Sequence, residues 1–402
     1  MQEAQYKTAT NYYEDVLNLL SNQFPRFLEE RTKLLFVAHA FEDKLPLLDV
    51  LLKKRMLSAI VLKRSSSQAQ PSIARTLSDM AREHDIPCIQ STGNDGKTLP
   101  TLYSPEKKVV INHGSYEIPT DDYCVQNNVV GMTEHTLNVE KRFRAVNQNN
   151  IIAFKSAAKI DLKQRSDREI SFSIAKEIMS NNEQIGKSIT SSNTDNVLLL
   201  IGYGVMGHFI AQELKRLNCT SDIIIDDISD KKKVFAIQDG FTVSKNINDI
   251  LPVADSIILS TDVIKGEAPV FTPKQLALLK EGVSLFSVTS ADDELQQGQL
   301  IKSGIIRKET MEGKHGIYTG PTGKRFFLMA DGKPANAYMA DGGVKEAMML
   351  VEAAVLAGAF ELAQNPRNCS ATLSNEAEEL VAQPWLKHYS QALSQYSALC
   401  AS

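Results

Sequence analysis

The chain is arranged around Val197-Leu198-Leu199-Leu200-Ile201-Gly202-Tyr203-Gly204-Val205-Met206-Gly207. Five apolar residues run without a polar break into a turn spaced Gly-x-Gly-x-x-Gly, and apolar residues then recur at helical intervals. A buried strand, a tight turn and a helix form the context in which this spacing indicates dinucleotide binding. Gly202 permits the turn, Gly204 lets the backbone approach a pyrophosphate, and Gly207 lets the helix pack closely on the strand.

The start of the predicted helix, at Val205 and Met206, points its free N–H groups and its dipole toward the phosphates. A second predicted strand, residues 222–225, leads into Asp226-Asp227. This pair lies about 20 residues beyond the turn, where a carboxylate accepts hydrogen bonds from the adenosine ribose. We expect Asp226 in this role, which favours NAD over NADP, although the lysines at 231–233 weaken the preference. The alternative is a glycine turn that holds no nucleotide.

Length and composition describe an ordinary globular protein of two or three domains. The chain has 402 residues, is 43% hydrophobic and 23% charged, and carries a net charge of −4. No basic stripe indicates a nucleic-acid partner, and no apolar run approaches the ~20 residues that span a bilayer. The N-terminus lacks a secretory pattern, so we expect a cytoplasmic protein. Five scattered cysteines form no Cys-x-x-Cys pair, so neither zinc nor a disulfide framework is predicted.

The first half of the chain alternates short apolar strands with helices, which predicts a parallel sheet covered on both faces. Strands are expected at 34–38, 57–62, 86–89, 109–111 and 129–132, and helices over most of 1–33, at 45–52 and at 73–84. No glycine fingerprint follows the first strand, so this half is predicted to bind the substrate. Residues 145–165 are polar and predict no strand.

The same rhythm continues after the glycine turn. Strands are expected at 256–262, 283–288, 305–306, 316–318 and 325–329, and helices at 167–179, at 275–279 and after Gly343. We expect an NAD-binding Rossmann domain at 181–338 and an α/β substrate domain at 1–180, completed by C-terminal helices at 339–402. A cleft between the two domains would close on the substrate about hinges near 181–182 and 341–343.

Three ordered segments resemble S-adenosylhomocysteine hydrolase, the NAD-containing enzyme that cleaves S-adenosylhomocysteine to adenosine and homocysteine. The first is the glycine turn at 201–207. The second is Val130-Gly131-Met132-Thr133-Glu134-His135-Thr136, which is similar to the family's Gly-x-Thr-Glu-Glu-Thr-Thr-Thr segment. The third is the strand, turn and asparagine at 326–336, beside the nicotinamide in the family. The resemblance extends in patches from about residue 34 to 362.

The resemblance implies chemistry in which NAD⁺ oxidises a ribose hydroxyl and acid/base groups move protons around the sugar. It places His39 and Lys159 among the catalytic residues, together with Glu134 in the segment at 130–136. The cofactor side would be lined by residues at four further positions: Thr136, Ser260, Thr261 and Asn336. From the residues alone, His39 can equally be a structural histidine, Lys159 a surface lysine and Glu134 a carboxylate at a helix start.

Four positions depart from the family's pattern. His113, His135 and Lys163 stand where the family has acids, and Ser290 stands where it has a histidine. We therefore count His113 and His135 as candidate catalytic residues with changed chemistry. Three histidines near strand ends also suggest a metal, but no ligand spacing supports one. The family's C-terminal Lys/Tyr tail is not recognisable here.

These observations favour a divergent NAD-dependent enzyme that oxidises a secondary alcohol of a nucleoside-like or other small substrate. The altered acid/base positions leave hydrolysis of S-adenosylhomocysteine open. The alternatives are an NAD-binding pseudoenzyme with a regulatory or scaffolding role, and an ordinary small-alcohol dehydrogenase with exchangeable NAD. A homo-oligomer, dimer or tetramer, is expected from the resemblance, with no nucleic-acid or membrane partner.

Overall fold

The computed structural model describes residues 1–63, 71–91, 99–102, 104–113, 118–147, 152–185, 196–219, 221–263, 267–288, 294–313, 315–332, 343–366 and 371–400. The chain divides into two compact units. Unit 1 comprises Met1–Ser166 and Gly342–Ser402, and unit 2 comprises Asp167–Asp341. The first division falls within helix α7 (Asp161–Gln184). Within the described helices, none is both long enough and apolar enough to cross a bilayer.

Unit 1 contains a parallel sheet of six strands in the order β3-β2-β1-β4-β5-β6, as the alternating pattern predicts. The strands are β1 (Lys33–Ala38), β2 (Leu57–Leu62), β3 (Cys88–Gln90), β4 (Lys108–Asn112), β5 (Val129–Glu134) and β6 (Ala153–Ser156). The strand order reverses at β1, which pairs with both β2 and β4. Open α/β sheets bind ligands outside the carboxyl ends of the strands at such a reversal.

Strand β6 lies in the stretch predicted to hold no strand. It is a short strand at the end of the sheet, and it carries polar residues that are nevertheless buried. Lys155 pairs with Glu361 at 2.5 Å and donates to the carbonyl of Thr372 at 3.0 Å, while Ser156 bridges Thr372. The polar residues break the apolar pattern of a buried strand, so the local sequence does not predict β6. They can be buried because distant partners satisfy them.

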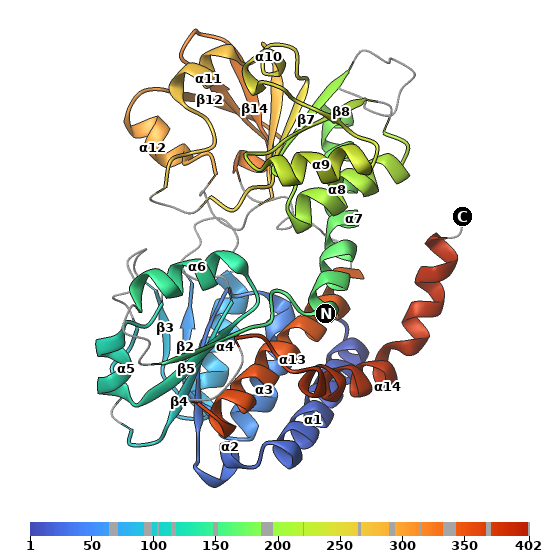
Figure 1. Ribbon diagram of the computed structural model, residues 1–402. Coiled ribbons are helices and arrows are strands. Elements are labelled where there is room, and N and C mark those ends of the chain that lie inside the picture. Colours follow the sequence, from blue (N-terminus) through green and yellow to red (C-terminus); the bar gives the residue numbers. More distant parts are fainter. Residues whose placement is uncertain are drawn as a thin grey trace. The chain divides into compact units, whose positions relative to one another are not determined.

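Helices from both ends of the chain complete unit 1. They are α1 (Glu3–Gln23), α2 (Arg26–Glu29), α3 (Leu45–Lys53), α4 (Pro71–Glu83), α5 (Asp121–Asn127), α6 (Leu137–Val146), α13 (Gly343–Gln364) and α14 (Asn375–Cys400), with a 3-10 turn η1 (Glu42–Lys44). Helices α13 and α14 lie beside α1 (Figure 1), and α13 also packs on β4, β5 and β6. At Gly358 an added Cβ would lie 2.7 Å from Oγ1 of Thr133, so glycine permits close packing of α13 on β5.

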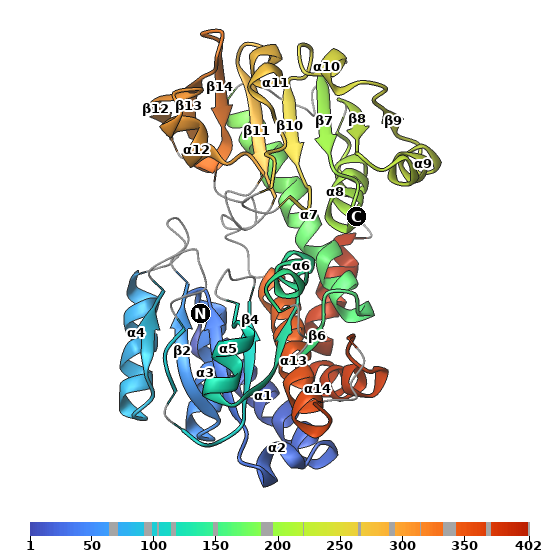
Figure 2. The ribbon, with the colours of Figure 1, turned by 60° about the vertical axis from the view of Figure 1, so that its left-hand side comes forward.

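Unit 2 has an eight-stranded sheet in the order β12-β13-β14-β11-β10-β7-β8-β9 (Figure 2). Its strands are β7 (Val197–Ile201), β8 (Asp222–Asp226), β9 (Thr242–Val243), β10 (Ser256–Leu259), β11 (Val283–Ser287), β12 (Arg307–Glu312), β13 (His315–Thr319) and β14 (Arg325–Leu328). The six neighbouring strands from β14 to β9 in this order are parallel. At the other end, β13 pairs antiparallel with β14 and β12 pairs antiparallel with β13. Strand order reverses at β7, so both units have Rossmann-type sheets, which confirms the predicted fold class.

The helices of unit 2 connect these strands: α8 (Val205–Arg216), α9 (Asp230–Gln238), α10 (Ile247–Ile250), α11 (Pro273–Leu278), α12 (Gln297–Lys302) and the 3-10 segment η2 (Met329–Gly332). The strand predicted at 305–306 is wrong, because pairing begins at Arg307. Every residue of β12 is exposed, so this edge strand has no apolar face to mark it in the sequence.

Candidate dinucleotide loop and imidazole cluster

The turn after β7 has a backbone that requires glycine at two of its three positions. Gly202 has φ +95°, and a Cβ there would clash with the carbonyl of Ser260. A Cβ at Gly207 would clash with the carbonyl of Gly202, because α8 begins directly against the end of the strand. The backbone therefore folds as the glycine spacing predicts.

Gly204 is different, because neither its backbone conformation nor its packing against the described residues requires glycine. It has φ −72° and ψ −164°, a conformation open to any residue. Among the described residues, an added Cβ would meet no atom within 4 Å. The described residues thus leave open the space in front of Gly204, at the N-terminus of the 12-residue helix α8. A ligand that approaches the backbone explains a glycine at this position.

Two acids follow β8, and they face different partners. Asp227 accepts the backbone N–H of Tyr203, in the glycine turn, at 2.7 Å and that of Ser229 at 2.8 Å. Asp226 accepts the hydroxyl of Ser244 at 2.7 Å and lies 3.3 Å from Nζ of Lys233. Side chains alternate along a strand, so only one of two successive acids can face the turn. Sequence reasoning selected Asp226, whereas the structure directs Asp227 at the glycine turn.

The loop after β10 is braced by a buried carboxylate that sequence reasoning missed. Glu294, 1% exposed, accepts the N–H of Thr261 at 2.6 Å, its hydroxyl at 3.0 Å and the hydroxyl of Ser287 at 2.9 Å. Ser260 donates its N–H to Ile201 at 2.9 Å. Glu294 ends an acidic run in the sequence, so nothing local distinguishes it. The predicted Asn336, like Ser290, lies outside the described residues.

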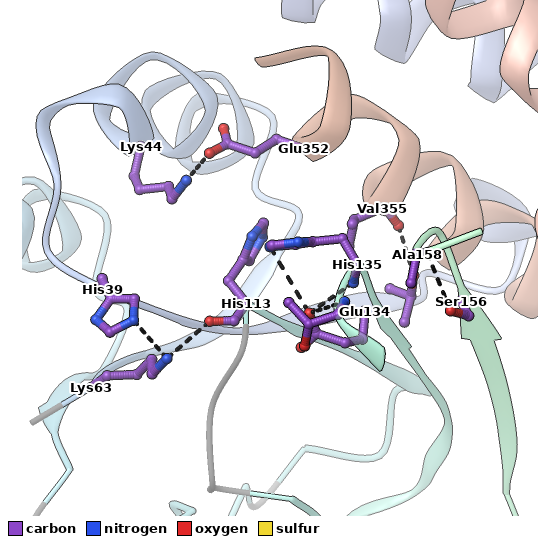
Figure 3. Close-up of polar contacts among 12 residues, drawn as sticks. His39, Lys44, Lys63, His113, Glu134, His135, Ser156, Ala158, Glu352 and Val355 are labelled. Carbon is purple, nitrogen blue, oxygen red and sulfur yellow. Dashed lines mark hydrogen bonds and ion pairs between the residues drawn. The ribbon is translucent and has the colours of Figure 1, made fainter. Parts of the chain in front are cut away.

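In unit 1, three of the predicted histidines gather at the carboxyl edge of the sheet. His39 follows β1, His113 follows β4 and His135 follows β5, so parallel pairing brings them together at the strand reversal. The rings of His113 and His135 lie 5.2 Å apart between centroids. Nζ of Lys63 lies 2.7 Å from Nε2 of His39 and donates to the carbonyl of His113 at 3.1 Å (Figure 3). We call His39, His113, His135 and Lys63 the imidazole cluster.

Burial and neighbouring lysines keep all three imidazoles neutral. Burial lowers the pKa of His39 well below its ordinary value, and Lys63 and Lys44 lower it further. Burial is also the largest cause for His113, followed by Lys44, and for His135, followed by Lys163. Lys44 and Lys63 act on the pKa of every ring in the cluster, so the rings share one positive environment.

Several ring nitrogens in the cluster are buried without a hydrogen-bond partner. Among the described residues, neither nitrogen of His113 has a partner, and Nδ1 of His135 has none. His113 is 4% exposed. Buried polar groups are normally paired, so these nitrogens mark a place where a polar ligand is expected. Within the described residues, no three His, Cys, Asp or Glu side chains are arranged to hold a metal.

Two other predicted residues have structural partners. Oε1 of the fully buried Glu134 accepts the N–H of His135 at 2.7 Å and that of Thr136 at 3.0 Å, just before α6 begins. This is the arrangement expected of a carboxylate at a helix start. Lys159 is 57% exposed and lies 3.7 Å from Oε2 of Glu140, with no contact to the cluster within the described residues. Its catalytic role stays a prediction.

A buried ion pair adjoins the cluster and was also missed. Lys44 pairs with Glu352 of α13, and Glu352 accepts the hydroxyl of Tyr13 at 2.8 Å. Glu352 is the one charged residue between positions 347 and 360 of α13, which was a signal for such a partner. Lys63 could likewise have been noticed, because it directly follows β2 and so lies at the same sheet edge as His39.

Together, the two reversal points and the glycine turn define a two-unit α/β protein of the Rossmann type. No family model matches the chain. By sequence, however, the chain is similar to several adenosylhomocysteinases, which confirms the resemblance.

The similarity rests on distant relatives. The chain is 26% identical over 269 residues to an adenosylhomocysteinase of Thermotoga maritima, covering 64% of this chain and 62% of that protein. It is 25% identical to an S-inosyl-L-homocysteine hydrolase of Methanopyrus kandleri, covering 63% and 58%. It is 22% identical to an adenosylhomocysteinase of Archaeoglobus fulgidus, covering 76% of this chain and 74% of that protein. The chain thus spans about three fifths of the length of the first two relatives.

Among solved structures, a phosphoglycerate oxidoreductase from Vibrio cholerae aligns with a TM-score of 0.41 and 12% identity, over 67% of this chain and 79% of that one.

Proposed function

We propose that this chain is an NAD-linked enzyme that oxidises a secondary alcohol of a small substrate, as a divergent relative of the adenosylhomocysteinases. The observation that carries the proposal is the turn at 202–207. Its own packing requires glycine at Gly202 and Gly207, while Gly204 is open toward a ligand. A turn of this shape at the start of a helix is suited to a pyrophosphate.

The residues of unit 2 fit the dinucleotide. The N–H groups at the start of α8 would hold the pyrophosphate, and Asp227 would accept the ribose hydroxyls. The loop of Ser260 and Thr261, braced by Glu294, would line the nicotinamide side. When bound, NAD⁺ supplies a hydride acceptor for the alcohol carbon. Asp227, which directly follows β8, is half-buried, which suits contact with a ligand.

The imidazole cluster of unit 1 would handle the substrate hydroxyl. Oxidation of an alcohol releases a proton, and a neutral imidazole with a free nitrogen can accept it. The low pKa of His113 and of His135 keeps both rings in that neutral form at pH 7. Lys63 holds His39 through Nε2, so that ring has a defined orientation. Lys159 and Glu134, predicted from the resemblance, remain further candidates for proton transfer.

Two measurements on the full chain test the proposal. Calorimetry with NAD⁺, together with analysis of nucleotide released on denaturation, shows whether a dinucleotide is bound. The chain is then incubated with S-adenosylhomocysteine and with S-inosylhomocysteine, and both NADH absorbance and released homocysteine are followed. We expect NAD to be bound. No heat and no released nucleotide would refute the proposal. Bound NAD without reduction by any alcohol tested would favour the pseudoenzyme, and loss of NAD on dialysis an ordinary dehydrogenase.

A further inference from the structure

The imidazole cluster also indicates the charge of the ligand it receives. Both nitrogens of His113 and Nδ1 of His135 are buried without a partner among the described residues. The two rings adjoin each other, with their centroids 5.2 Å apart. One ligand group placed against them could therefore pair with more than one orphaned nitrogen. These nitrogens therefore point to a position for a polar ligand group.

The surroundings of the rings favour a negative group. The ammonium of Lys63 is buried, with the residue 7% exposed, and it contacts both His39 and the backbone of His113. The charges of Lys44 and Lys163 also act on the rings, since both lower the pKa of His135. A site surrounded by cations stabilises an anion and disfavours a cation.

The nearby carboxylates are held by their own protein partners. Glu352 is paired with Lys44 and Tyr13, and Glu134 accepts backbone N–H groups with Oε1. Asp43 lies 3.0 Å from Nζ of Lys44. These acids are satisfied by groups at the margin of the cluster. Oε1 of Glu134 also lies 3.9 Å from Nε2 of His135, but none of these acids accepts a hydrogen bond from His113 or from Nδ1 of His135.

From this arrangement we infer that the imidazole cluster binds an anionic group of the substrate, a carboxylate or a phosphate. The substrate is then a small hydroxy acid or the phosphate ester of a polyol. Neutral imidazoles donate one N–H each to the anion, and Lys63 supplies the compensating charge. The inference rests on the proposed function in taking this cluster as the substrate site, but anion binding itself requires no NAD.

Three related probes separate charge from shape: glycerate, glycerol 3-phosphate and glycerol. Each is titrated into the full chain without NAD⁺ by calorimetry, while the histidine ring resonances are followed by NMR. We expect at least one anion to bind ten or more times tighter than glycerol and to shift the resonances of His113 and His135. The tighter of the two anions identifies carboxylate or phosphate as the group. Equal binding of all three probes, or no detectable binding of either anion, would overturn the inference.

Matched variants locate the binding. Lys63→Met removes the buried charge, and Lys53→Met removes a 59% exposed lysine on α3 as the control. His113→Phe keeps the ring packing on Phe36, whose centroid lies 5.1 Å away, and removes only nitrogens that have no partner among the described residues. We expect anion binding to be about tenfold weaker in Lys63→Met and in His113→Phe. The control Lys53→Met should bind the anion as wild type does. His113→Phe decides the matter should Lys63→Met fail to fold. Wild-type affinity in His113→Phe contradicts the inference, whereas absent NAD binding contradicts only the proposed function.

Discussion

Two neighbouring glycines in one turn should respond to the same substitution in opposite ways. In Gly202→Ala, the added methyl group meets the carbonyl of Ser260, and the residue must hold a φ of +95°. In Gly204→Ala, the methyl group enters space that the described residues leave open, at a φ of −72°. We therefore expect the first glycine to serve folding and the second to serve ligand binding, although the sequence motif presents them alike.

The magnitudes follow from backbone strain and chain entropy. A left-handed conformation costs a non-glycine residue roughly 1–2 kcal/mol, and relief of the clash raises the total for Gly202→Ala to about 3 kcal/mol. For a unit of this size, about 2–4 °C is lost per kcal/mol, so Tm should fall by about 6–12 °C. At a compatible site, Gly→Ala stabilises by about 0.4–1 kcal/mol. Gly204→Ala should therefore melt no lower than wild type while binding NAD⁺ at least about tenfold more weakly.

Calorimetric melting and NAD⁺ titration of both variants provide the assay. Gly320→Ala is the matched control, because its new Cβ would make only ordinary contacts of 3.6–3.9 Å in the same unit. We expect this control to keep both its Tm and its NAD⁺ affinity. The reasoning is refuted if Gly204→Ala binds NAD⁺ as wild type does, or if Gly202→Ala melts at the wild-type temperature.

Three further predictions follow from the two sites. Asp227→Asn should weaken NAD⁺ binding about tenfold by calorimetry, whereas Asp226→Asn should change it little; the reverse order would restore Asp226 to the ribose. Lys44→Met should cost about 3–5 kcal/mol in urea unfolding, because it strands the buried carboxylate of Glu352, and adding Glu352→Gln should recover most of that loss; no recovery would count against the pair. Because the pKa of His113 is depressed in the folded state, the unfolded chain binds more protons than the folded chain below pH ~6.5. The free energy of unfolding should therefore fall as the pH falls from above ~6.5 toward ~5. His113→Phe should lose less of this free energy than wild type, and equal losses would exclude His113 as the origin.

The resemblance and the structure agree on the fold. The structure brings some of the candidate residues together and leaves others apart. The strands predicted at 34–38, 57–62, 109–111 and 197–201 are all present, because each is an apolar run, broken only by Ser58, that belongs in a sheet covered on both faces. The histidines came together because parallel pairing aligns the carboxyl ends of β1, β4 and β5. Lys159, placed among the catalytic residues by the resemblance alone, lies exposed beside Glu140, and its catalytic role stays a prediction.

The sequence by itself determined what depends on neighbouring residues: the apolar strands, the helices between them, and the glycines of a turn whose steric limits are local. Only the tertiary structure decided what depends on distant partners. It showed that Asp227 faces the glycine turn, that Lys63 joins His39 and His113, and that Glu352 reaches Lys44 across some 300 positions of chain. Strand β6 was hidden for the same reason, because groups far away in sequence compensate its buried polar residues. Strand β12 pairs with the adjacent β13, but all of its residues are exposed, so no apolar face marks it in the sequence.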